Sequence, residues 1–507
     1  MGIAGIHASR DIHTFQNVGT FLKTGLKGAS IQNMRLDITS REEFRSCLPT
    51  LVANVADFGD RSAPEPVRAM SAWLINQGAQ QLGVKLNSPD SFYRAMALGK
   101  FDRQLAVPAI NIRGNSLDTA RAVFSAANEL GVGAFISEIA RSEIGYTNQQ
   151  GREYAAVNQA AAMLEGWTGP LFLQGDHIQL SAEKVGKGGA DEEKEQAAHS
   201  ALIRSLLTYG FGSIDLDMSP FEKRNNAELS FDEQQRVNYD LTARKIWEIR
   251  DLERELELPY TVMLGGETGE VGKMNTRRED IEAYANGLVR ALDEIRNETG
   301  LTLESIRKIA VQTGTSHGGI TLPDGSKAEV KIDFGVLAMA REASKRFGWA
   351  GPVQHGASTL PDAAFSNFVT SGAAEVHLAT GFQDIIFDTG IVKVPGLQSM
   401  IEKFLVSKLI GEWKDGQTFA QFAKGSRKKA NGPFKFEMWT MPEEVRQLVS
   451  NVLRAKFAFL FGALCVTDTR DLVSQHVSDI NFTLPYPAKE TAEVQQTTDD
   501  GGKDLAD

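Results

Sequence analysis

Short apolar runs rich in β-branched residues alternate with longer amphipathic stretches over most of this chain. The short runs span residues 106–111, 134–138, 170–174, 212–217, 260–264, 308–312, 352–354 and 374–380. Between them, apolar positions recur three or four residues apart, as in helices packed on one face, over residues 117–130, 153–165, 192–209, 231–256, 278–299, 333–347 and 361–371. Eight such strand–helix repeats predict an α/β fold, a closed (β/α)8 TIM barrel.

The chain exceeds a minimal barrel at both ends. Residues 1–104 show helical patterning broken by Pro49, Pro64 and Pro66, and predict a helical N-terminal extension. Residues 105–395 would form the catalytic barrel, and residues 396–486, with helix-like stretches at 396–411 and 442–460, a helical C-terminal extension. Residues 487–507 are rich in polar and acidic residues and nearly lack large apolar ones, so we expect a disordered tail.

Charge and cysteine content narrow the class of protein. The 507 residues include 54 Lys and Arg against 65 Asp and Glu, and the net charge of −11 argues against nucleic acid or an anionic membrane as the partner. The sequence has no run of about 18 apolar residues and no signal-peptide core. Two cysteines, Cys47 and Cys465, are too few for a disulfide framework. We expect a cytoplasmic protein, a homo-oligomer that acts on a small molecule.

Candidate chemistry lies at the ends of the predicted strands. Six of the eight strands end in Asp, Glu or His, and these residues are Asp176 and His177, Asp217, Glu267, His317, His355 and His377. Functional sites of such barrels form at this end, where the βα loops begin. Because imidazoles and carboxylates are ligands of divalent metals, the pattern predicts a metal-dependent enzyme. We expect His7, His13, His199 and His476, which lack such a context, to be surface or packing residues.

These pieces, in this order, resemble the class II, metal-dependent fructose-bisphosphate and tagatose-bisphosphate aldolase family. The matching motifs are Asp176-His177, Asp217-Met218-Ser219, Gly266-Glu267-Thr268-Gly269, Gly314-Thr315-Ser316-His317-Gly318 and His355-Gly356-Ala357-Ser358. The resemblance covers roughly residues 107–383 and leaves both extensions unexplained.

The resemblance implies a role for each matching residue. It implies one or two bound divalent ions, of which zinc is one, with His177, His317 and His355 as ligands. Glu267 and Asp217 would ligate an alternate metal position or lie beside it. Asp176 is implied as the acid/base that takes a proton from the substrate hydroxyl. The implied substrate or phosphate contacts are Gly318, Gly356, Ser358 and Thr380, with Asn111 nearby.

The eighth strand departs from the family pattern. The family has Asn-x-Asp-Thr where this chain reads His377-Leu378-Ala379-Thr380. In the family the Asn anchors the dihydroxyacetone phosphate part of the substrate and the Asp orders the phosphate loop. His377 could instead bind an uncharged or carboxylate substrate, or join the metal, so both a sugar phosphate and an unphosphorylated sugar stay open as substrates.

Three functions follow from this site. The first is a zinc-dependent lyase that cleaves or forms a ketose by a reversible aldol step. The second is an epimerase of a hexuronate or ketohexonate, which uses the same retro-aldol step, rotates the aldehyde and re-forms the bond. The third, of another class, is a non-catalytic sugar-binding subunit that contains a metal.

Overall fold

The computed structural model describes residues 14–269, 274–301, 303–314, 322–323, 332–358 and 360–487. Its centre is a barrel of eight parallel strands: β4 (Val107–Asn111), β5 (Ile136–Ala140), β6 (Gly169–Gln179), β7 (Ser213–Asp217), β8 (Met263–Thr268), β9 (Lys308–Val311), β10 (Pro352–Gln354) and β11 (Glu375–Leu378). The hydrogen-bonded order runs β6-β5-β4-β11-β10-β9-β8-β7, and β7 pairs with β6 again. The predicted closed barrel is therefore confirmed.

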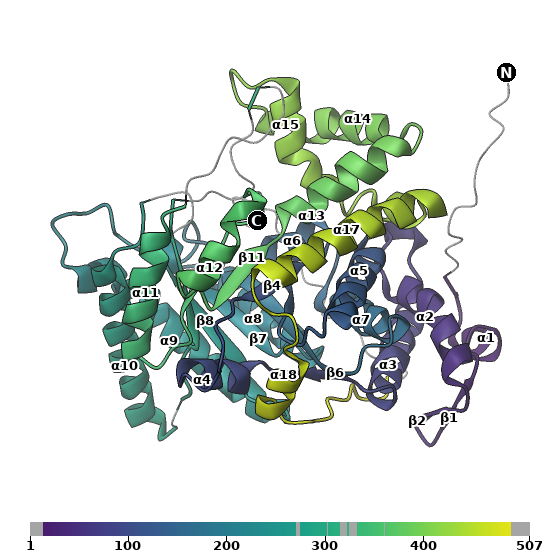
Figure 1. The fold of residues 1–507 in the computed structure, drawn as a ribbon, viewed down its shortest axis with the longest axis horizontal. Coiled ribbons are helices and arrows are strands. Elements are labelled where there is room, and N and C mark those ends of the chain that lie inside the picture. The colour runs from purple at the N-terminus through teal and green to yellow at the C-terminus, as the bar shows by residue number, and fades with distance from the viewer. Residues whose placement is uncertain are drawn as a thin grey trace.

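Helices surround the barrel and cover its outer face (Figure 1). They are α5 (Ser116–Glu129), α7 (Gly151–Leu164), α8 (Ala190–Thr208), α9 (Phe231–Glu255), α10 (Arg278–Thr299), α11 (Phe334–Arg346) and the short α12 (Ser366–Thr370). Strands such as β4 and β11 are buried along their whole length, because their outward side chains pack on helices and their inward side chains fill the barrel. The same burial explains why these strands appear in the sequence as continuous runs without alternation.

The N-terminal extension contains strands as well as helices. A hairpin of β1 (Ala29–Gln32) and β2 (Arg35–Ile38) precedes α2 (Arg41–Val55) and α3 (Glu65–Gln81). The four-residue β3 (Val84–Asn87) then adds to the barrel sheet beside the first residues of β6. Next comes α4 (Asp90–Ala97), whose fully buried Tyr93 donates a hydrogen bond to Glu375 on β11. The extension thus reaches the polar interior of the barrel.

The C-terminal extension begins beyond β11 with α13 (Thr380–Ile385), which leads to α14 (Leu397–Leu409) and α15 (Phe419–Ser426). Figure 1 shows these two helices at one end of the molecule, and α17 (Glu443–Ala463) packed along α5. The extension contacts the segment after β9, where the Thr418 hydroxyl donates to the carbonyl of Pro323 at 2.8 Å. Among the described residues, no helix has the length and apolar character needed to span a membrane.

Candidate metal centre

A bulge in β6 places two consecutive side chains in the site. The register of β6 against β7 shifts between Gly175 and Ile178, and His177 has a backbone φ of 42°, in the left-handed region. In a regular strand Asp176 and His177 would point to opposite faces of the sheet, whereas a bulge redirects a side chain. Here Asp176 lies beside His377, and His177 lies beside Asp217 and Glu267. Such a strained conformation at a non-glycine residue is typical of functional sites.

One group of potential metal ligands comprises His177, Glu267 and His355. All three are buried, and one ligand atom from each lies within 4.8 Å of the others. The His177 Nδ1 atom is 3.2 Å from Asp217 Oδ2 and 3.3 Å from Glu267 Oε2. With zinc–ligand bonds of about 2.0–2.1 Å, the edge of a coordination tetrahedron is about 3.3–3.4 Å. Both the donor types and their spacing therefore fit a divalent metal.

Neighbouring groups fix the carboxylates of this cluster. The Asp217 Oδ1 atom accepts hydrogen bonds from the Ser219 amide at 2.9 Å and from the Ser219 hydroxyl at 2.7 Å, which leaves Oδ2 toward His177. Burial, together with the charge of Asp217, raises the pKa of Glu267 to about 8. Burial lowers the pKa of His177, but the charges of Asp176 and Glu267 outweigh it and raise that pKa well above 6.5. A bound cation would take the place of the protons that Glu267 and His177 hold at neutral pH.

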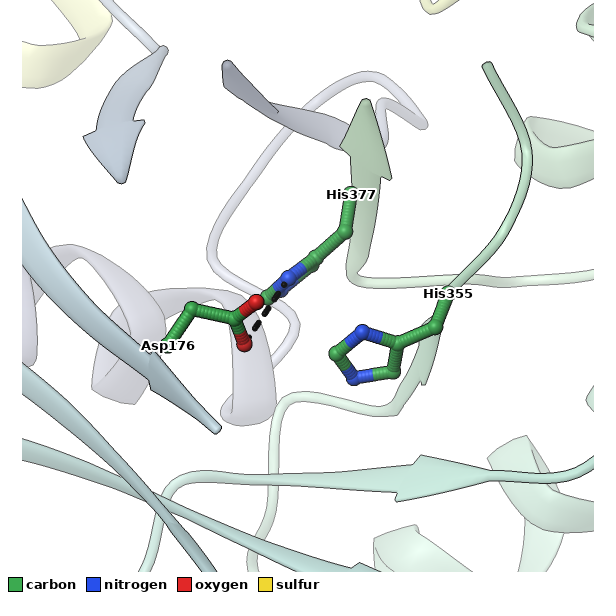
Figure 2. A group of neighbouring side chains, drawn as sticks. All are labelled: Asp176, His355 and His377. Carbon is green, nitrogen blue, oxygen red and sulfur yellow. Dashed lines mark ion pairs between the residues drawn. The ribbon is translucent and has the colours of Figure 1, made fainter. Parts of the chain in front are cut away.

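The third imidazole, His377, lies between carboxylates on both sides. Its Nδ1 atom is 2.8 Å from Glu138 Oε2 and 3.2 Å from Asp176 Oδ1, and its Nε2 atom is 2.6 Å from Glu375 Oε1. Figure 2 shows the Asp176 carboxylate at the His377 ring, with His355 beside them. The ring centroids of His355 and His377 are 4.2 Å apart, and those of His177 and His355 are 4.3 Å apart. Three imidazoles therefore form a row, with His355 in the middle.

Below this row the barrel interior is charged, whereas most barrels of this kind hold branched aliphatic side chains there. The fully buried ammonium of Lys308 pairs with Glu375 and, at 3.0 Å, with Asp215 Oδ2. It also donates to Gln174 Oε1 at 2.7 Å. Burial raises the pKa of Glu375, but the charges of Lys308 and His377 outweigh it and bring that pKa to about 2.

The structure brings together Asp176, His177, Asp217, Glu267, His355 and His377, all predicted from the sequence. His317 and Gly318 lie outside the described residues. Asn111 is buried and donates to Glu143, a residue that also pairs with Arg113. Gly356, with a φ of 69°, and the buried Ser358 follow β10, and the buried Thr380 follows β11. These three therefore lie after the last two strands, on the same rim as the cluster.

Sequence reasoning missed Glu138, Asp215, Lys308, Glu375 and Tyr93, which surround the site from below. Part of the signal was present, because Glu375 and His377 on β11, like Asp215 and Asp217 on β7, are two residues apart and so share one face of a strand. His199, expected as a surface or packing residue, is fully buried and its Nε2 atom lies 3.1 Å from the carbonyl of Ile178. His476 is partly exposed and contacts the ring of Phe101, and His7 and His13 lie outside the described residues.

A family model described as Fructose-bisphosphate aldolase class-II matches residues 96–415, well over half of the chain. The chain belongs to this family. The family match covers all eight barrel strands and the His177–Glu267–His355 group, and it extends past the end of α14 in the C-terminal extension.

One solved structure shares the fold at a TM-score above 0.5. A probable tagatose 6 phosphate kinase from Sinorhizobium meliloti 1021 has a TM-score of 0.52 at 13% identity, over 71% of this chain and 100% of the other. The fructuronate-tagaturonate epimerase UxaE from Cohnella laeviribosi has a TM-score of 0.49 at 13% identity, over 88% of this chain and 90% of the other. A fructose-bisphosphate aldolase from Campylobacter jejuni has a TM-score of 0.45 at 16% identity, with coverages of 76% and 97%.

Proposed function

We propose that this protein is a metal-dependent lyase that cleaves a ketose, or a ketose phosphate, by a reversible aldol step. The observation that carries the proposal is the buried His177–Glu267–His355 cluster with Asp176 next to it in the chain. Class II aldolases are typically metal-dependent, and two imidazoles with one carboxylate form a donor set suited to zinc. His317, which lies outside the described residues, is our further candidate for a ligand.

A divalent ion held there would supply a Lewis acid for the negative charge that develops on the substrate's carbonyl oxygen. The chain's own residues would do the rest. Asp176 is 1% exposed, and although burial raises its pKa, the charges of His177 and His377 outweigh this effect and hold the pKa well below 3.8. Asp176 is therefore ionised at neutral pH and would accept the proton of the substrate hydroxyl beyond the bond that breaks. It would return the proton in the condensation direction.

The rim after β10 and β11 would hold the other end of the substrate. Loops at this place in a barrel often bind phosphate through backbone amides and small polar side chains. Gly356, Ser358 and Thr380 have that position, and we propose them as the contacts for a phosphate or another anionic group. Asn111 is already engaged by Glu143, so we propose that it orders the rim and does not bind the substrate directly.

An epimerase of a sugar acid is the second candidate, and one observation favours it. His377 stands where the family pattern has the Asn that anchors a triose phosphate, and its ring is fully buried between Glu138 and Glu375. That side chain is thus committed to carboxylates of the barrel and offers no amide to a triose phosphate. A substrate without that phosphate, whose fragments recombine before release, suits this arrangement.

The test is turnover of fructose 1,6-bisphosphate, tagatose 1,6-bisphosphate and a panel of hexuronates by the full chain loaded with zinc. Coupled dehydrogenases detect released trioses, and NMR detects interconversion of the sugar acids. Protein stripped with EDTA is the control. Triose release that EDTA abolishes supports the lyase, and metal-dependent interconversion without trioses supports the epimerase. A metal-loaded protein inert toward the whole panel would refute both and favour a sugar-binding subunit.

A further inference from the structure

The carboxylates in the barrel interior divide into two sets with different counter-charges. Asp215 and Glu375 share the buried ammonium of Lys308, which also donates to Gln174. This set is neutralised from within the chain. Although Asp215, Glu375 and His377 lie close enough together to ligate a metal, Lys308 already supplies the cation there.

The second set consists of Glu138 and Asp176. Both residues are at most 1% exposed, and both approach the Nδ1 atom of His377, at 2.8 and 3.2 Å. Within the part of the chain that the structure describes, no Lys or Arg side chain pairs with either carboxylate at 4.0 Å or less. Two buried carboxylates facing one ring nitrogen are costly unless a positive charge lies between them.

A held carboxylate lies on the other side of the His377 ring. The Nε2 atom lies 2.6 Å from Glu375 Oε1, and Glu375 is fixed by Lys308 and by the Tyr93 hydroxyl. Metal-ligating histidines almost always donate their second ring N–H to such a held carboxylate, which sets the tautomer. With the proton on Nε2, the Nδ1 lone pair of His377 faces the lone pairs of the Glu138 and Asp176 oxygens. A positive charge between these atoms satisfies all three, and it is supplied either by a second ring proton or by a bound metal ion.

We propose that Asp176, His355 and His377 form a second divalent-cation position, with Glu138 beside it. Ligand atoms of the three residues lie within 4.8 Å of one another, and all three residues are buried. Two imidazoles and a carboxylate suit zinc, cobalt or a similar ion of intermediate softness. Asp176 binds through Oδ1, the oxygen nearest His377, and its second oxygen keeps the role proposed above. The second position stands whether or not the chain cleaves a ketose.

His355 connects the second position to the first. It belongs to both donor groups, and its ring lies 4.3 Å from that of His177 and 4.2 Å from that of His377, centroid to centroid. A neutral imidazole offers one lone pair, so His355 ligates both cations as an imidazolate, with its N–H proton released to solvent. The row of imidazoles therefore holds two cations per chain, one at each end.

The test is to count metal ions in the full chain after EDTA treatment and titration with Co²⁺, followed by visible absorption and by elemental analysis. The wild type should bind two equivalents and His377→Asn one. His199→Asn is the matched control, because His199 is equally buried but its Nε2 atom bonds the backbone carbonyl of Ile178, and it should keep two. Glu138→Gln should weaken only the second equivalent, by about 10- to 100-fold, as expected for a partner of a ligand.

One equivalent in the wild type would overturn the proposal, because a proton on His377 would then supply the charge. Two equivalents in His377→Asn would overturn it as well. If circular dichroism shows that His377→Asn does not fold, Glu138→Gln decides, and an unchanged second equivalent in that variant counts against the proposal. Because ions are counted without a substrate, failure here is distinct from failure of the proposed reaction.

Discussion

Replacing Lys308 with Met should strongly destabilise the fold. Methionine keeps the unbranched stem of the side chain but lacks the terminal ammonium, so the buried Glu375 and Asp215 lose their shared counter-charge. Removing one partner of a buried ion pair typically costs about 3–5 kcal/mol. Because Gln174 at 2.8 Å and His377 at 2.6 Å still hold Glu375, we expect a loss near the lower end, about 3 kcal/mol in the free energy of unfolding at pH 7.

Urea unfolding, followed through the fluorescence of the buried Trp73, Trp167 and Trp439, measures this loss. Lys345→Met is the matched control, since Lys345 pairs with Glu342 at the surface, where the two side chains are 53% and 59% exposed. That exposed pair should contribute no more than about 0.5 kcal/mol. A Lys308→Met protein within about 1 kcal/mol of the wild type would refute the buried-charge reasoning.

The dependence on pH gives a second check of the same reasoning. The pKa of Glu375 is about 2 in the folded protein, against an ordinary value of 4.5 for a glutamate side chain in water. A lowered pKa stabilises the fold above the unfolded value, and the contribution disappears as pH falls through the folded value. The difference in stability between wild type and Lys308→Met should therefore be complete above about pH 5 and shrink toward pH 2.

Three further predictions concern the site and its surroundings. Asp176→Asn should keep metal at the His177–Glu267–His355 position and lose turnover by about 10² or more, as for a positioned acid/base, and unchanged turnover would refute that role. His355→Ala should lower metal content and turnover together, which metal analysis beside a rate assay checks; full metal retention would contradict its place in both donor groups. Glu222 is 3% exposed in its side chain, and burial raises its pKa to about 7 against the pull of Arg224 and the Gly269 amide. The contribution of Glu222 to stability is therefore full below pH 4.5 and is lost as pH rises through about 7. In Glu222→Gln the free energy of unfolding in urea should decline less between pH 5 and 8, by at most about 3 kcal/mol. An unchanged pH profile would count against the raised pKa.

The barrel was readable from the sequence because its strands are buried on both faces. The run at 352–354 coincides with β10, and the run at 106–111 contains β4. The fifth run, 260–264, stops short of β8, which continues to Thr268. The missed residues include Gly265 and Gly266, which give no apolar signal because a side chain there would collide with Asp215 and Tyr284 respectively. The four-residue β3 was too short to stand out from its helical surroundings.

The candidate site was readable where motifs mark strand ends and unreadable where charges lie inside strands. His177 and Glu267 lie near the ends of β6 and β8, and His355 follows β10, all in glycine-containing segments, so their position at the rim was predictable. Lys308 and Glu138 lie within strands, where a charged residue ordinarily indicates a face exposed to water. Only closure of the barrel turns that face inward and brings Lys308 to Glu375, two residues that are far apart in the sequence.

Tyr93 also determines how far the charges of the barrel act. Its ring, fully buried and 5.9 Å from the Lys308 ammonium, belongs to the N-terminal extension and forms the floor of the barrel at Glu375. Without that floor, water could enter from below and screen every charge between Lys308 and the row of imidazoles. By keeping the interior at low dielectric, the extension strengthens the attraction of the Lys308 ammonium for Glu375 and Asp215. A barrel without the first hundred residues would keep these ligand residues but lose the exclusion of water on which their charge interactions depend.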